Sequence, residues 1–139
     1  MTNDEENMMS LDWPTFVLQR RINQPLADVQ RTLCDPASVG AGSELELGSH
    51  GRLIVDRRFS RAPFPSEESF VAQGTLHTSR GQRVARVEVE VGAWSSDATV
   101  LMLRPVSRHP QRWSGRRATR YFELAHEGVD AIARLAEAS

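Results

Sequence analysis

Alternating apolar and polar residues mark the predicted strands of this chain. The clearest alternation is residues 84–91, Val-Ala-Arg-Val-Glu-Val-Glu-Val, where Arg86, Glu88 and Glu90 separate the apolar positions. A period of two sends successive side chains to opposite faces of a sheet, so one face is predicted to be dry and the other wet. Similar patterns, separated by turn residues, predict six strands, at residues 15–22, 43–47, 52–59, 69–78, 82–93 and 98–106.

Two segments have the three- and four-residue spacing of an amphipathic helix. The first, residues 25–33, is short and has Pro25 in its first turn, where a missing N–H costs nothing. The second, residues 115–137, follows Ser114, a residue type that commonly caps helix N-termini. Only this second helix is long enough to cover the dry face of the sheet. Its predicted apolar stripe comprises Ala118, Tyr121, Phe122, Ala125, Val129, Ile132 and Leu135 or Ala136.

The order of these elements resembles the START-like superfamily, also called SRPBCC or helix-grip, which includes polyketide cyclases and dehydrases, lipid-transfer domains and plant pollen allergens. The resemblance rests on residues 23–29, Asn-Gln-Pro-Leu-Ala-Asp-Val, on residues 33–36, Leu-Cys-Asp-Pro, and on the closing helix from Arg117 to Leu124. It implies an α+β fold in which a curved antiparallel sheet of six or seven strands wraps around the C-terminal helix. We expect one such domain at residues 13–139, after a flexible tail at residues 1–12.

The resemblance also implies a cavity between sheet and helix that binds a small apolar or aromatic molecule, such as a lipid or a polyketide-like compound. The protein would then act as a carrier or sensor of that molecule. Two alternatives stay open: a polyketide cyclase or dehydrase type of enzyme, and a protein-interaction module of the chaperone-activator or ribosome-associated type. The residues predicted to contact the ligand are Leu18, Arg20, Leu53, Val55, Arg57, Val87, Val89, Tyr121, Ala125 and Val129.

Arg20 and Arg57 are unusual because the alternation assigns both to the inner face. A buried guanidinium is costly unless it meets a carboxylate, a carbonyl, water or an anionic ligand. One hypothesis is that one of them, together with Tyr121, holds a carboxylate or enolate oxygen of the ligand. The alternative is that both lie near strand ends and reach solvent.

Exposed aromatic and basic residues suggest two kinds of surface. Trp94 and Trp113 could pack beneath loops, or together with Phe64 they could form a cavity mouth or a contact for another protein. The open sheet edges make a homodimer possible. The segment from Arg104 to Arg120 holds six arginines. It could bind an anion, or it could be a solvated face paired with the glutamates of residues 84–91.

Composition narrows the remaining possibilities. The chain has 139 residues, a net charge of −1 and 40% hydrophobic residues, values typical of one globular domain without general nucleic-acid affinity. Its single cysteine, Cys34, excludes an internal disulfide, and the four histidines lack metal-ligand spacing, so we expect no metal and no cofactor. Without a signal peptide or a membrane-spanning apolar run, a cytoplasmic location is expected. All basic residues are Arg, which indicates a GC-rich genome such as that of an actinobacterium.

Overall fold

The computed structural model describes residues 13–61 and 68–138. The predicted order of elements is confirmed, and most boundaries lie within two residues of those expected. The described elements are η1 (Trp13–Phe16), β1 (Leu18–Ile22), α2 (Leu26–Leu33), β2 (Glu44–Leu47), β3 (Gly51–Arg61), β4 (Ser69–Thr78), β5 (Arg83–Ala93), β6 (Thr99–Pro105), η2 (Pro110–Arg112) and α3 (Gly115–Glu137).

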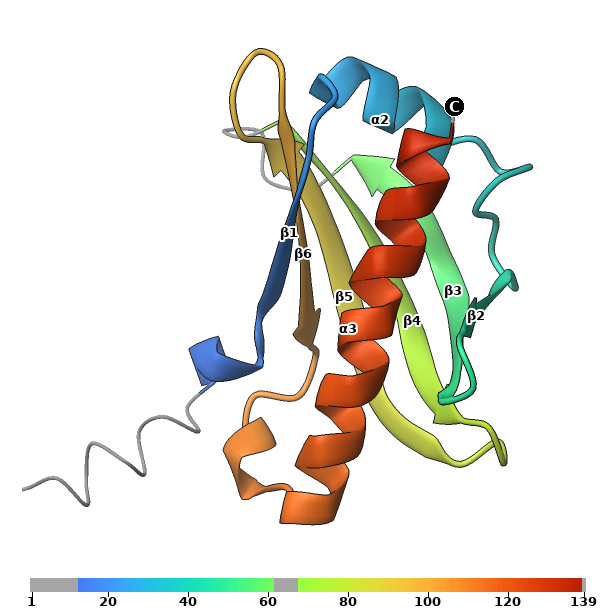
Figure 1. The fold of residues 1–139 in the computed structure, drawn as a ribbon, viewed down its shortest axis with the longest axis vertical. Coiled ribbons are helices and arrows are strands. Elements are labelled where there is room, and N and C mark those ends of the chain that lie inside the picture. The colour runs from blue at the N-terminus through green and yellow to red at the C-terminus, as the bar shows by residue number, and fades with distance from the viewer. Residues whose placement is uncertain (1–12, 62–67, 139) are drawn as a thin grey trace, which may run out of the picture.

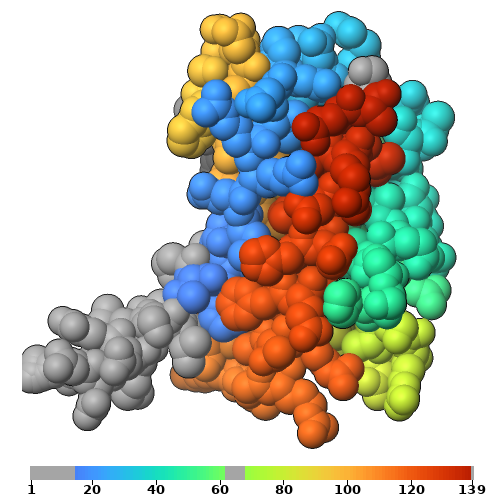
Figure 2. Space-filling view, viewed as in Figure 1, coloured from blue at the N-terminus to red at the C-terminus, as the bar shows by residue number. Residues whose placement is uncertain are grey.

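The six strands form one antiparallel sheet in the order β1-β6-β5-β4-β3-β2. The sheet curls around α3, which runs along its concave face, and α2 lies across one end (Figure 1). In the space-filling view α3 forms the middle of this side of the molecule, flanked by β1 and by β2 (Figure 2). The architecture is the expected helix-grip fold. In the part of the chain that the structure describes, no helix is long and apolar enough to cross a bilayer.

The core fills the space between α3 and the sheet. Ser114 caps α3 as predicted, with its side chain accepting a hydrogen bond from the Arg117 N–H at 3.2 Å. The predicted stripe is largely buried, but it omitted Leu124, which is only 2% exposed. It also omitted Gly128, where an added Cβ would lie 3.4 Å from Leu103 of β6. The helix therefore packs directly on the sheet along much of its length.

The outer face of the sheet is polar, as the alternation predicted, and its charges form a cross-strand network. Arg104 donates to Glu88 at 2.5 Å and to Glu90 at 2.9 Å. Glu88 also accepts a hydrogen bond from Gln73, which in turn accepts one from Arg86 at 2.7 Å. Arg104 is thus ion-paired with the glutamates of β5. It is one of the six arginines that the sequence offered as a possible anion-binding patch.

Two boundaries differ from the prediction at the start of the chain and in β3. The first strand was expected from residue 15, but residues 13–16 form a 3-10 helix and β1 begins at Leu18. Phe16 is buried all the same, at 1% exposure. In contrast, β3 continues to Arg61, two residues beyond the expected end. The tail at residues 1–12 lies outside the described residues.

The placement of Arg57 on the inner face was wrong. The pairing of β3 with β4 shifts register twice, between Val55 and Arg57 and again between Arg57 and Ser60. Each bulge adds an unpaired residue to β3 and changes the side to which the next side chain points. Arg57 is therefore exposed, while Val55 before the first bulge and Phe59 within the second remain buried.

The two tryptophans that suggested a partner surface lie far apart. Trp113 packs against Phe16 at 5.7 Å and Tyr121 at 5.4 Å between ring centroids, so it belongs to an aromatic cluster beside the start of α3. Trp94 lies in the turn between β5 and β6, at the other end of β6 from Trp113, and is 60% exposed. Phe64, the third aromatic residue of that interpretation, lies outside the described residues.

Candidate functional site

Seven of the ten residues predicted to contact a ligand are packed into the core between α3 and the sheet. Leu18 is half-buried at its edge, Arg20 is half-buried on β1, and Arg57 is exposed. Whether any of the ten touches a ligand remains a prediction. The seven buried residues are Leu53, Val55, Val87, Val89, Tyr121, Ala125 and Val129.

The hypothesised Arg–Tyr pair does not form. Arg20 donates to Asp130 of α3 at 2.5 Å and approaches Glu137 at 3.4 Å, so its partners are carboxylates of the protein itself. The Tyr121 hydroxyl donates to the Phe16 carbonyl at 2.5 Å. Burial raises the pKa of Tyr121 well above its usual range, which makes its proton hard to transfer. Both side chains therefore hold β1 and η1 to α3.

The other candidate groups are Cys34 and the side chains that could bind a metal. Cys34 ends α2 and is half-buried, and this burial raises the pKa of its thiol, as expected for a packing residue rather than a nucleophile. Across residues 13–61 and 68–138, no three His, Cys, Asp or Glu side chains gather as a metal site would require.

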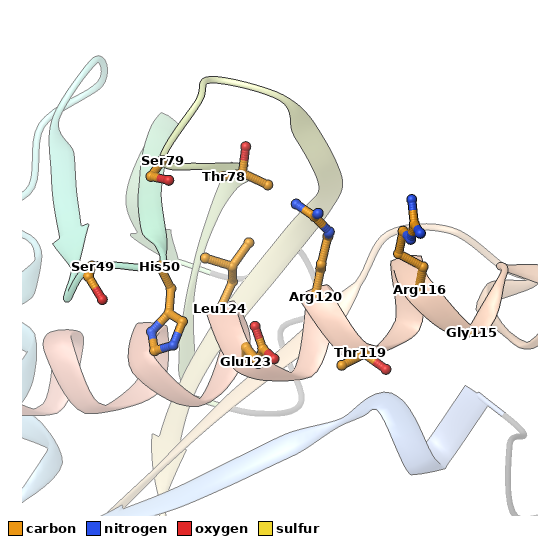
Figure 3. Close-up of a pocket in the computed structure, with 10 residues that line it drawn as sticks. All are labelled: Ser49, His50, Thr78, Ser79, Gly115, Arg116, Thr119, Arg120, Glu123 and Leu124. Atoms are coloured by element: carbon orange, nitrogen blue, oxygen red, sulfur yellow. The ribbon is translucent and has the colours of Figure 1, made fainter.

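A pocket of about 610 Å³ opens between the first three turns of α3 and two turns of the sheet, one joining β2 to β3 and the other joining β4 to β5 (Figure 3). We call it the α3–turn pocket. Leu124 rises from α3 toward the strands and supplies an apolar floor, while hydroxyl, guanidinium and imidazole groups form the walls (Figure 3). Its lining residues are Ser49, His50, Thr78, Ser79, Gly115, Arg116, Thr119, Arg120, Glu123 and Leu124.

Strand pairing brings the two turns together. Gly51, the first residue of β3, pairs with Thr78, the last residue of β4, so the two turns lie side by side at the same end of the sheet. The Ser79 N–H then donates to the His50 carbonyl at 3.1 Å. A glycine is required at position 51, because a Cβ there would lie 1.9 Å from the His77 carbonyl oxygen and 2.9 Å from the Leu124 side chain.

A second, smaller opening of about 230 Å³ shares Thr78, Arg116 and Arg120 with the α3–turn pocket. It is bordered in addition by Arg83 and Arg117. Arg117 is engaged by the protein, since its Nε donates to the Val84 carbonyl at 2.8 Å and its guanidinium lies 4.3 Å from the centre of the Trp113 ring. The surroundings of the two openings are thus locally basic in a chain whose net charge is −1.

Sequence reasoning found part of this pocket and missed the rest. Arg116 and Arg120 belong to the predicted anion-binding patch, and their four-residue spacing places them on one helix face. Ser49, His50 and Thr78 were not predicted, because the register of β3 against β4 brings them to α3 and no local pattern reports that register. The apolar type of Leu124, three residues after Tyr121, was the available signal for the floor.

The observed architecture confirms the helix-grip fold that the resemblance implied, and a solved structure shares this fold. Protein Ms6760 from Mycobacterium smegmatis aligns with a TM-score of 0.50 and 10% identity, covering 92% of each chain. Protein MLL2253 from Mesorhizobium loti gives 0.45 and 14%, covering 88% of this chain and 96% of that one. ZhuI aromatase/cyclase from Streptomyces sp. R1128 gives 0.42 and 13%, covering 87% and 92%. No family model and no curated protein matches the sequence.

Proposed function

We propose that this protein binds a small molecule with an apolar or aromatic body in the α3–turn pocket, as a cytoplasmic carrier or sensor. The observation that carries the proposal is the pocket itself. Its volume of about 610 Å³ falls within the range of small-molecule sites, roughly 300–1,000 Å³. Its lining combines one apolar side chain, Leu124, with hydroxyl, guanidinium and imidazole groups that converge on the same space.

The proposal places the ligand at the end of the core rather than in its middle. Leu124 both lines the pocket and belongs to the apolar core, so it lies between the two. A ligand that displaced the Leu124 side chain would reach the core, which includes Leu53 and Tyr121. The predicted lining residues would then form the inner wall of an enlarged site.

The geometry favours neither alternative function. Arg20 and Tyr121, the groups suggested for cyclase chemistry, are both engaged by protein atoms. Trp94, in the turn between β5 and β6, and Trp113, beyond the other end of β6, suggested an interaction module but lie at opposite ends of the sheet. Ligand binding is therefore the function to test first.

The test is a fluorescence titration with N-phenylnaphthylamine, a neutral aromatic probe whose emission rises in apolar surroundings. We expect saturable, one-to-one binding that weakens by about tenfold or more when Ser79→Phe fills the pocket from its exposed rim. The matched control is Ser96→Phe, in the exposed turn between β5 and β6. Absence of saturable binding, or equal binding by both variants, would overturn the proposal.

A further inference from the structure

Five arginines of the described residues form ion pairs with carboxylates, and the two that line the α3–turn pocket are not among them. Arg20, Arg86 and Arg104 each form an ion pair with a carboxylate. Arg116 and Arg120 form none with any residue that the structure describes, although both line the pocket and the smaller opening beside it. Figure 3 shows both side chains leaving α3 on the side of the β4–β5 turn, with Arg120 directed toward Thr78.

Without a bound anion, the charges of these two arginines lower the stability of α3. Arg116 lies in the first turn of α3, where the partial positive charge of a helix N-terminus disfavours cations, and no acidic residue is present in that turn. Arg120 follows four residues later, a spacing at which like charges on one face repel. A negatively charged ligand beside them would relieve both effects, whereas a neutral ligand would relieve neither.

The other polar groups of the pocket are compatible with an anion at this place. The Thr78 hydroxyl already accepts a hydrogen bond from the Gln82 N–H at 3.1 Å, so its own proton is available to another acceptor. Glu123 is the one carboxylate among the lining residues, and it lies almost a turn beyond Arg120 along α3. An anion would therefore sit near Arg116 and Arg120, and an apolar body would extend over Leu124.

We propose that Arg116 and Arg120 hold an anionic group of the ligand, so that the ligand class is an amphipathic anion: an apolar or aromatic body that ends in a carboxylate or sulfonate. This inference rests on the proposed function and narrows the ligand to negatively charged molecules. Guanidinium groups suit this role because their fixed fork of N–H donors can meet two oxygens of a carboxylate or sulfonate at once.

The test compares two probes with the same ring system, neutral N-phenylnaphthylamine and anionic anilinonaphthalene sulfonate. The wild-type protein should bind the anionic probe more tightly, and this preference should shrink as salt is added. In the double variant Arg116→Gln/Arg120→Gln we expect the affinity for the anionic probe to fall by about tenfold or more. The affinity for the neutral probe should change by less than about twofold.

The matched control is the double variant Arg108→Gln/Arg112→Gln, which removes the same charge from two exposed residues that line neither opening. Equal loss in this control, or no preference for the anionic probe in the wild type, would overturn the inference while leaving the proposed function intact. Failure of both probes to bind the wild type would overturn the proposed function and this inference with it. The melting temperature of each variant verifies folding, and the single variants carry the test should the double variant unfold.

Discussion

At the scale of single residues, Tyr121 shows how one polar atom fixes the start of the fold to its end. The side chain is fully buried, packs against Phe16 and Trp113, and donates its hydroxyl proton to the Phe16 carbonyl across 105 residues of sequence. A tyrosine on an apolar stripe is consistent with a core or a catalytic role from sequence alone. The hydrogen bond to the Phe16 carbonyl gives Tyr121 a structural role.

Replacing Tyr121 with Phe should lower the free energy of unfolding by about 1–3 kcal/mol, because the buried Phe16 carbonyl loses its donor. Burial raises the pKa of Tyr121 above its ordinary value near 10. Above about pH 10 the unfolded chain therefore releases this proton while the folded protein keeps it, and the wild type loses stability as pH rises. The advantage of the wild type over Tyr121→Phe should be constant below about pH 10 and shrink above it.

Denaturant unfolding of both proteins across alkaline pH measures this effect. Since Tyr121 is the only tyrosine, the ultraviolet absorbance of tyrosinate reports its ionisation without interference. An advantage that stays constant through this range, or tyrosinate that appears in the folded protein near pH 10, would contradict the prediction.

At the scale of elements, the close contact between β3 and α3 depends on one glycine. Gly51 begins β3 where the strand passes between the His77 carbonyl of β4 and the Leu124 side chain of α3. A Cβ at this position would meet both neighbours, so the glycine permits their close approach. The same contact sets the distance between the β2–β3 turn and the helix, and so helps to shape the α3–turn pocket.

Gly51→Ala should destabilise the protein by about 2 kcal/mol or more, since the new methyl group has no space unless the strand moves. Gly92→Ala in β5 is the matched control, because a Cβ there meets only the Ser69 Cβ at 3.9 Å. We expect the control to change stability by less than about 0.5 kcal/mol. Thermal or urea unfolding of the two variants provides the measurement, and similar stabilities would show that β3 adapts without cost.

At the scale of the whole molecule, the two edges of the sheet differ. β2 pairs only with the first four residues of β3, and the exposed arginines Arg57, Arg58 and Arg61 follow on the remaining part of that strand. Two copies pairing there would bring like charges together, and charged edges of this kind oppose association. The opposite edge is formed by β1, whose five residues are held to α3 by Arg20.

The homodimer suggested by the open sheet edges remains a prediction, and the exposed arginines of β3 favour the β1 edge for it. Native mass spectrometry over a range of protein concentrations gives the subunit count. If a dimer forms, hydrogen exchange should slow in residues 18–22 on association and stay unchanged in residues 56–61. A monomer at every concentration would contradict the dimer, and slower exchange at residues 56–61 would contradict the choice of edge.

The sequence by itself determined which elements form and in what order. Alternation in β5, the stripe and Ser114 cap of α3, and the turn glycines all report local backbone geometry, which neighbouring residues control. These signals were sufficient for the six strands, the two α-helices and the resemblance to the helix-grip fold. They also placed most of the apolar core, because burial follows the period of each element.

Only the tertiary structure decided where the charged groups point and where a ligand could enter. The bulges that expose Arg57 arise from the pairing of β3 with β4, and Arg20 meets Asp130 across 110 residues of sequence. The α3–turn pocket likewise joins two turns and a helix that adjoin only after the sheet has formed. Register and side-chain packing are properties of the whole chain, so no local period in the sequence could reveal them.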